Sequence, residues 1–302
     1  MAKREGYDVT DEWLEQINED LRKKDVPHKR RPWDAWREWS KHVGVSTSLA
    51  DEDVKKIFEW FEKNAKAGSQ YIDPMYVGSL YYDSCFWPIV IPVVLGSPYL
   101  DASKSLRTMP DSIKACLMRD RDSFINFAAF WADCADYGFG IEEVIKNNSI
   151  GAFGQELFRS GNQQLNATVT LLHEDIPNPK SMESARMATE MFLKAYLAGK
   201  ISLTEKEAKD KIGHNIEKAL DRCLAVDNQS ELQVIRPGLS CFPEIGDRYK
   251  GTDKTPSELW QGYQIAQFVG TTVVRAFTHR DVRKTLRIGG PRSIGPVHRV
   301  LY

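Results

Sequence analysis

The sequence predicts an all-α protein, and three observations favour this fold class. Apolar residues recur at intervals of three and four along most of the chain, the spacing that gives a helix one buried face. Ser, Thr and Gly stand at the ends of several of these segments, where helices begin and stop. No segment of any length alternates polar and apolar residues as a half-buried strand does. The 302 residues are 42% hydrophobic and 27% charged, which excludes a disordered chain and allows one large domain or two ordinary ones.

The first part of the chain, residues 1–146, is predicted to be a tryptophan-rich helical region in which no known family is recognised. Three helices are expected near its beginning, at Asp11 to Lys24, Trp33 to His42 and Asp51 to Ala67. Trp33, Trp36 and Trp39 recur every three residues and form one stripe on a helix. Such a stripe favours docking against the body of the protein over stacking on nucleobases.

The stretch from Tyr71 to Pro110 is rich in aromatic residues and prolines. Because proline removes a hydrogen-bond donor and clashes with the preceding turn, we expect short buried helices broken by turns. The long apolar run from Tyr76 to Leu95 contains Asp83 and Pro88, which disfavour a membrane span. Helical periodicity then resumes from 111 to 137.

The second part, residues 147–302, is predicted to be a bundle of four or five helices followed by a basic tail. The expected helices are Ala152 to His173, Ser181 to Gly199, Thr204 to Val226 and Ser257 to His279. Thr204 and Glu207 form a capping box, and Gly199 is placed as a helix stop. Gly213 is expected to interrupt the third helix, and the residues from 227 to 255 to form a loop.

Three short motifs follow one another in this second part. They are ATEMFLKA at Ala188 to Ala195, GHNIEKAL at Gly213 to Leu220, and DRY at Asp247 to Tyr249. The first is similar to the A-x-E-x-x-L-K-A pattern of the HEPN superfamily, and the second to its G/T-H-D/N-L stretch. These are small helical bundles named for higher eukaryotes and prokaryotes and for nucleotide binding. The order and spacing of the motifs over residues 152–280 resemble that superfamily.

The resemblance implies both a ligand site and a possible catalytic pair. The ligand-binding residues that it indicates are Glu190, Lys194, His214, Asn215, Arg248 and Tyr249. The family contains metal-independent ribonucleases that use an R-x4-6-H motif in a dimer, and non-catalytic members that bind nucleotides or proteins. The nearest match here is Arg275 and His279, with three intervening residues and Ala276 where a polar residue often follows the arginine. His279 would act as general acid or base and Arg275 would stabilise charge on a phosphate.

Each of these residues also has a structural interpretation. Arg275 and His279 can belong to a basic helix end that complements the helix dipole. Glu190 and Lys194, one turn apart, are typical of a solvated ion pair. His214 lies on the polar side of its predicted helix, and Asn215 is a suitable helix cap if Gly213 breaks the helix.

Charge and cysteine content narrow the remaining possibilities. Basic and acidic residues number 41 and 42, so any attraction to RNA must be local, as in the tail from Arg275 to Tyr302. That tail can bind phosphates, bind an acidic partner or be merely solvated. The five cysteines have neither CxxC nor zinc-site spacing, which predicts buried free thiols in a reducing compartment, without metal or cofactor. The charged first residues do not resemble an export signal, so a cytoplasmic protein is expected.

These observations predict a protein that binds RNA or a nucleotide, with metal-independent RNA cleavage by Arg275 and His279 as its catalytic form. The resemblance adds a homodimer and a bacterial defence or toxin-antitoxin setting. The alternative is a non-catalytic protein-binding module, such as an immunity or adaptor protein, that binds its partner through the tryptophan-rich N-terminal half.

Overall fold

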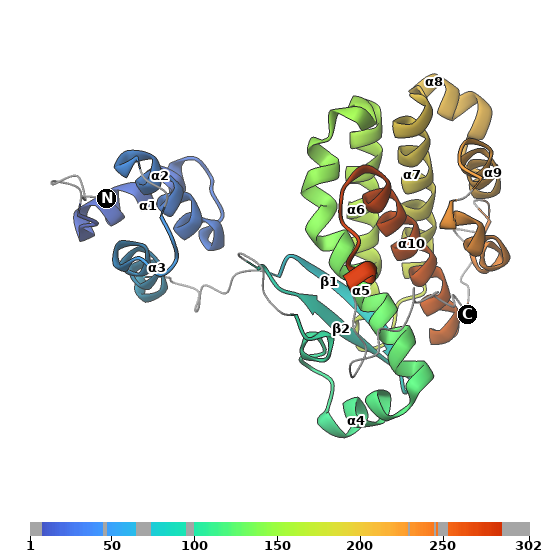
Figure 1. The fold of residues 1–302 in the computed structure, drawn as a ribbon, viewed down its shortest axis with the longest axis horizontal. Helices are drawn as coiled ribbons and strands as arrows, with labels where there is room; N and C mark the ends of the chain where they lie inside the picture. The colour runs from blue at the N-terminus through green and yellow to red at the C-terminus, as the bar shows by residue number, and fades with distance from the viewer. Residues whose placement is uncertain are drawn as a thin grey trace. The chain divides into compact units, whose positions relative to one another are not determined.

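The computed structural model describes residues 8–44, 47–64, 74–94, 100–228, 230–244, 246 and 253–285. The chain forms two compact units, Met1–Asp73 and Pro74–Tyr302 (Figure 1). The boundary therefore lies at Asp73 and differs from the predicted boundary at 146. Residues 74–146 pack with the second unit because their hairpin and long helix bury apolar side chains in its core.

The first unit consists of three helices with a core of their own. They are α1 (Asp11–Lys23), α2 (Arg31–Val43), preceded by the 3-10 turn η1 (His28–Arg30), and α3 (Glu52–Asn64). The tryptophan stripe of α2 is used within this core: Trp39 is buried, and the rings of Trp33 and Trp36 meet Phe58 of α3 at centroid distances of 4.9 and 6.2 Å. The stripe thus joins two helices of the unit.

The second unit is built mainly of helices. In chain order they are η2 (Ala102–Ser105), α4 (Asp111–Arg119), α5 (Arg121–Lys146), η3 (Asn148–Ile150), α6 (Gly151–Leu172), α7 (Ser181–Ile201), α8 (Glu205–Glu207), the π-helical turn η4 (Ala208–Ile212), α9 (Ile216–Val226), the 3-10 helix η5 (Glu231–Cys241), α10 (Pro256–Phe277) and η7 (Val282–Thr285). The 3-10 helix η5 lies within a segment that the sequence predicts as a loop. All four predicted helices of the bundle are present, with ends shifted by a few residues.

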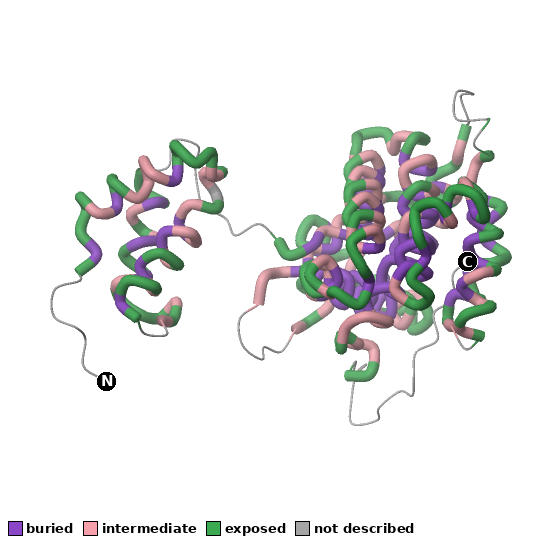
Figure 2. Tube along the Cα trace, turned by 90° about the horizontal axis from the view of Figure 1, so that it is seen from above, coloured by how far each residue is buried: buried purple, intermediate pink, exposed green. Residues whose placement is uncertain are grey.

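Helix α7 occupies the centre of this bundle. It packs against α6, α9 and α10, and its buried side, which includes Phe192 and Leu193, contributes to a continuous apolar core (Figures 1 and 2). The helix does not stop at Gly199 as predicted. A Cβ at Gly199 would lie 2.3 Å from the ring of Phe277, so this glycine allows α10 to approach closely.

A β-hairpin replaces the short helices expected between Tyr71 and Pro110. Strands β1 (Tyr76–Tyr82) and β2 (Cys85–Ile91) pair antiparallel. Both turn residues, Asp83 and Ser84, have positive φ, at 52° and 61°, which matches the twist that tight hairpins require. The prediction was wrong because it gave the prolines more weight than the aromatic and branched residues, which favour strands. In the part of 147–302 that the structure describes, no strand occurs.

Two further expectations concern the membrane and the cysteines. Within the described ranges, every helix is too short or too polar to traverse a lipid bilayer.

All five cysteines are free thiols, but only three of them are buried, at 134, 223 and 241. Burial raises the pKa of Cys241 to about 12. Cys85 and Cys116 are exposed, which corrects the expectation that all five are buried.

Candidate functional site

The first candidate site is centred on Glu190, in the middle of α7. Arg186, Glu190 and Lys194 follow one another at one-turn spacing, so their side chains share one side of the helix. Glu190 is only 6% exposed and Lys194 only 8%. The pair is therefore buried, and the interpretation of a solvated surface pair is wrong.

Three basic groups surround the Glu190 carboxylate. Lys194 Nζ lies 2.6 Å and His214 Nδ1 lies 3.1 Å from Oε1, while Arg186 Nη1 lies 3.6 Å from Oε2. A buried carboxylate without such partners would lose its hydration without compensation. Both oxygens of the carboxylate thus face a permanent cation, Lys194 at Oε1 and Arg186 at Oε2.

The backbone around Gly213 brings His214 to Glu190. The turn η4 ends at Gly213, whose φ of 60° and ψ of −132° suit glycine alone. The chain then reverses, and Arg186 Nη2 donates to the carbonyl oxygen of His214 over 2.9 Å. Asn215 Oδ1 accepts from Lys218 N over 2.8 Å and caps α9, as the sequence predicts. The interruption at Gly213 thus positions two predicted site residues.

The contact with Glu190 also sets the tautomer of the neutral His214 ring. A carboxylate accepts hydrogen bonds and donates none, so Nδ1 is the nitrogen that donates. In the neutral imidazole, Nε2 then keeps its lone pair. The side chain of His214 is 71% exposed, so a ligand can reach this nitrogen.

A pocket of about 670 Å³ opens beside this cluster. It is lined by Arg186, His214, Asn215, Ile216, Glu217, Leu239, Phe242, Pro243, Glu244 and Gly246. Its lining combines apolar groups, one aromatic ring, Arg186 and the first turn of α9, and Glu217 and Glu244 contribute exposed carboxylates. The volume is in the range of sites that hold whole small molecules.

The structure thus brings together four of the six predicted ligand-binding residues: Glu190, Lys194, His214 and Asn215. The other two, Arg248 and Tyr249, lie outside the described residues. Sequence reasoning missed Arg186, although its position one turn before Glu190 on the same side of α7 could have indicated it.

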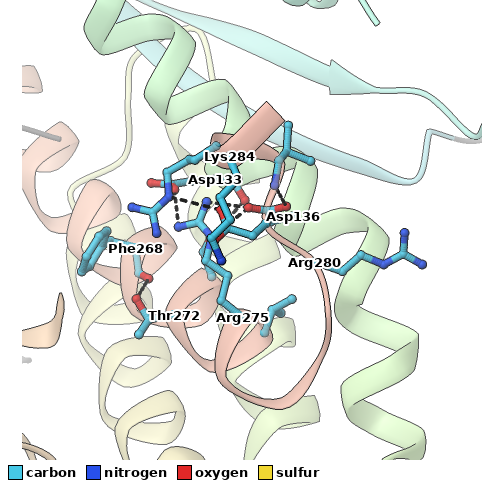
Figure 3. Close-up of polar contacts among 12 residues, drawn as sticks. Asp133, Asp136, Phe268, Thr272, Arg275, Arg280 and Lys284 are labelled. Carbon is cyan, nitrogen blue, oxygen red and sulfur yellow. Dashed lines mark hydrogen bonds and ion pairs between the residues drawn. The ribbon is translucent and has the colours of Figure 1, made fainter. Parts of the chain in front are cut away.

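The predicted catalytic pair is placed differently. The side chain of Arg275 is only 9% exposed. Its Nη1 lies 2.8 Å from Asp133 Oδ1, its Nη2 lies 2.6 Å from Asp136 Oδ2, and its Nε donates to the same Asp136 oxygen over 2.8 Å (Figure 3). Arg275 therefore joins α10 to α5 inside the unit, where it balances two buried carboxylates.

His279 is not on the helix that carries Arg275. Helix α10 ends at Phe277 and the cap residue Thr278 is extended, so the expected alignment of the pair on one helix face is wrong. His279 is exposed. Arg275 lies in the last turn of α10, as the interpretation of a basic helix end expects, and it also forms the two ion pairs described above.

Asp133 and Asp136 are the partners of Arg275 that the sequence analysis overlooked. They occur one turn apart in the apolar segment FAAFWADCADYGFG, where a charged residue needs a partner. Burial raises the pKa of Asp136 above its ordinary value, and the charge of Arg275 offsets part of this effect. Asp136 Oδ1 also accepts from the backbone N–H of Val282 over 2.7 Å, which holds η7 against α5.

The beginning of the basic tail is neutralised in the same region. Arg280 pairs with Glu143, Arg283 with Glu231 over 2.9 Å, and Lys284 with Asp281 over 3.0 Å. These basic residues are thus engaged with the folded unit. The predicted phosphate-binding function of the tail falls on residues 286–302, which lie outside the described residues.

Neither a metal cluster nor a relative identifies the site. Among the residues that the structure describes, no group of three or more His, Cys, Asp or Glu side chains is arranged to hold a metal ion. Comparisons with protein-family models, with curated proteins and with solved structures found no match.

Proposed function

We propose that the second unit binds a nucleotide, either free or as the terminal nucleotide of an RNA, in the pocket beside Glu190. The observation that carries this proposal is that Arg186, His214 and Asn215 line one pocket, and that the buried Glu190 beside Lys194 holds Arg186 and His214 there. These residues come from separate segments, and the pocket has the volume of a small-molecule site.

The part of the pocket that Arg186 lines suits a phosphate group. Arg186 offers a planar guanidinium, which matches the geometry of phosphate oxygens. The backbone N–H groups of the first turn of α9 add a partial positive charge. His214 contributes a further donor when its Nε2 is protonated. Glu190 holds Arg186 and His214 in position through its two oxygens.

The part of the pocket lined by Glu217, Phe242 and Glu244 suits the rest of a nucleotide. The carboxylates of Glu217 and Glu244 can accept hydrogen bonds from ribose hydroxyls, a contact that dinucleotide-binding proteins use. The ring of Phe242 offers a surface on which a base can stack. The same carboxylates repel further phosphates, so a single nucleotide fits this surface better than a long polyanion.

Binding, rather than cleavage, is the activity that this geometry favours. Arg275 is occupied by two buried carboxylates, and His279 lies beyond the end of its helix. Cleavage by this pair in a HEPN-like dimer, and a defence setting, stay predictions. RNA degradation that persists in a chelator and is lost in His279→Ala would support them.

Calorimetric titration with adenosine and uridine 5′-monophosphates tests the binding proposal. Arg186→Gln should weaken binding by about ten- to hundredfold, because it removes one charged hydrogen-bonding group. The matched control is Arg159→Gln, an exposed arginine of α6 away from the pocket, which should leave the affinity unchanged. If no nucleotide binds, or if both variants lose affinity equally, the proposal is wrong.

The alternative function, protein binding through the N-terminal half, has one structural observation in its favour. Met1–Asp73 forms a compact unit with its own apolar core around Leu14, Ile57 and Phe61. A unit of this kind can serve as a separate recognition module. A stable complex of the full chain with a protein partner, without any nucleotide binding, would favour this alternative.

A further inference from the structure

A second cavity, of about 190 Å³, lies in the same unit between the hairpin and helices α4, α5 and α10. Its lining is Leu80, Tyr81, Tyr82, Leu117, Ser123, Asn126, Phe127, Phe130, Trp260 and Gln264. It shares no residue with the pocket beside Glu190. Any function of this cavity is therefore independent of the proposed nucleotide site.

The lining of this cavity has no charged side chain. All ten residues are apolar, aromatic, hydroxylic or carboxamide groups, which are neutral at pH 7. An ion that entered would lose its hydration without gaining a counter-charge. The cavity therefore favours an uncharged ligand, in contrast to the pocket that contains Arg186, Glu217 and Glu244.

Aromatic rings form much of the wall. Phe130 and Trp260 meet edge to face, with centroids 4.9 Å apart and an interplanar angle of 66°. Trp260 also contacts Tyr263, which is fully buried and fixes the indole in place. Rings held in this way offer flat surfaces and edges to a planar guest at little further cost in side-chain freedom.

Two polar groups of the lining have hydrogen-bonding capacity to spare. The Asn126 carboxamide and the Trp260 indole N–H make no hydrogen bond to another residue in the described part of the chain, whereas Ser123 is engaged with the Asp120 carboxylate. A carboxamide both donates and accepts, so Asn126 can pair with a ligand edge that carries both kinds of atom. Gln264, only 8% exposed, adds a second carboxamide to the lining.

The volume limits the size of the guest. A cavity of about 150 Å³ accepts a benzene ring, whereas pockets for drug-sized molecules begin at about 300 Å³. A space of about 190 Å³ therefore fits one planar ring system with its substituents better than a complete nucleotide.

We infer that this cavity binds a small, uncharged, planar heteroaromatic ring with an amide-like edge, the chemistry shared by free nucleobases and aromatic amides. The rings of Phe130 and Trp260 bind the faces and edges of the guest, and Asn126 pairs with its polar edge. Neutrality of the lining selects against charged rings of the same size.

Titration with nicotinamide and nicotinate tests this inference, because the two probes share a ring and differ in charge. Nicotinamide should bind with a Kd of about 1 mM or tighter, as expected for a fragment of this size, and nicotinate at least about tenfold more weakly. Adenine and uracil form the nucleobase arm, and their affinities relative to nicotinamide show which source of the ring the cavity prefers.

Two variants locate the binding. Asn126 is exposed at the cavity, so Asn126→Asp should retain the fold and weaken nicotinamide binding at least about tenfold. Asn166→Asp makes the same change at an exposed position of α6 outside the cavity and should leave the affinity unchanged. In an NMR spectrum, the ligand should also shift the indole N–H signal that disappears in Trp260→Phe.

The inference is overturned if no ring binds, if nicotinate binds as well as nicotinamide, or if the Trp260 signal does not move while a ring binds. Equal losses in the two Asn→Asp variants would also overturn it. None of these results depends on the nucleotide titration, since Arg186→Gln leaves the cavity lining intact.

Discussion

Replacing Arg275 by methionine should strongly destabilise the second unit. The change keeps a side chain of similar length but removes the guanidinium that pairs with both the Asp133 and the Asp136 carboxylates of α5. These two side chains are 1% and 0% exposed, so water cannot replace the lost guanidinium without opening the fold.

The expected loss is about 3–5 kcal/mol, the usual cost of removing one partner from a buried ion pair. For a unit of this size, each kcal/mol lowers the melting temperature by about 2–4 °C, so the midpoint should fall by about 6–20 °C. Neutralising all three groups, by adding Asp133→Asn and Asp136→Asn to Arg275→Met, should recover part of this loss.

Calorimetry and far-ultraviolet circular dichroism at pH 7 measure these midpoints. His279→Ala is the matched control, because it removes the other member of the predicted catalytic pair at an exposed position. A midpoint for Arg275→Met that equals that of the control would refute the reasoning. The comparison also separates a loss of activity caused by unfolding from one caused by chemistry.

Three further changes test other parts of the second unit. Gly213→Ala should lower the free energy of unfolding by about 1–3 kcal/mol, because φ of 60° with ψ of −132° is strained for alanine, and a thermal melt measures this loss. The same change should displace His214 and weaken nucleotide binding, which a titration measures. The pKa of Glu258 is lowered to about 2 by the backbone N–H at position 255 and by Lys254. Its stabilising contribution is therefore present above its ordinary pKa of 4.5 and lost as the pH falls toward 2, so the difference in urea midpoint between the protein and Glu258→Gln should shrink over this range. Truncation after position 280 should lower the melting temperature, because it removes the contacts of η7 with α5 and η5.

The truncation after position 280 tests a prediction from the sequence about the tail. Apolar periodicity ends before Arg280, which predicts that the residues beyond it are dispensable for folding. The structure instead shows Val282 bonded to Asp136 and Arg283 paired with Glu231. These contacts join residues far apart in the chain, so no local pattern indicates them.

The helices of the second unit were predictable because their signals are local. The capping boxes at Thr204 and Thr255 and the cap at Asn215 each involve residues at most three positions apart. The hairpin was missed although its residues favour strands, because pairing between β1 and β2 gives no helical or alternating pattern in either strand alone. The proline in β2 indicated a break, yet Pro88 is accommodated within the hairpin.

The candidate site shows the same division between local and tertiary information. The sequence by itself determined that Glu190 and Lys194 share a helix face, and that Gly213 ends one helix before His214. In the sequence, Glu190 and Lys194 have the same four-residue spacing as Glu207 and Lys211, and in the structure each of these two pairs forms a salt bridge. Only the tertiary structure decided that the first pair is about one-tenth exposed and the second about one-half, at side-chain exposures of 8% and 10% against 40% and 50%. The physical reason is that helix periodicity and capping depend on neighbours within one turn, whereas burial depends on which helices pack together. Once the Glu190–Lys194 pair is buried, the carboxylate loses its hydration, and His214 and Arg186 compensate for this loss.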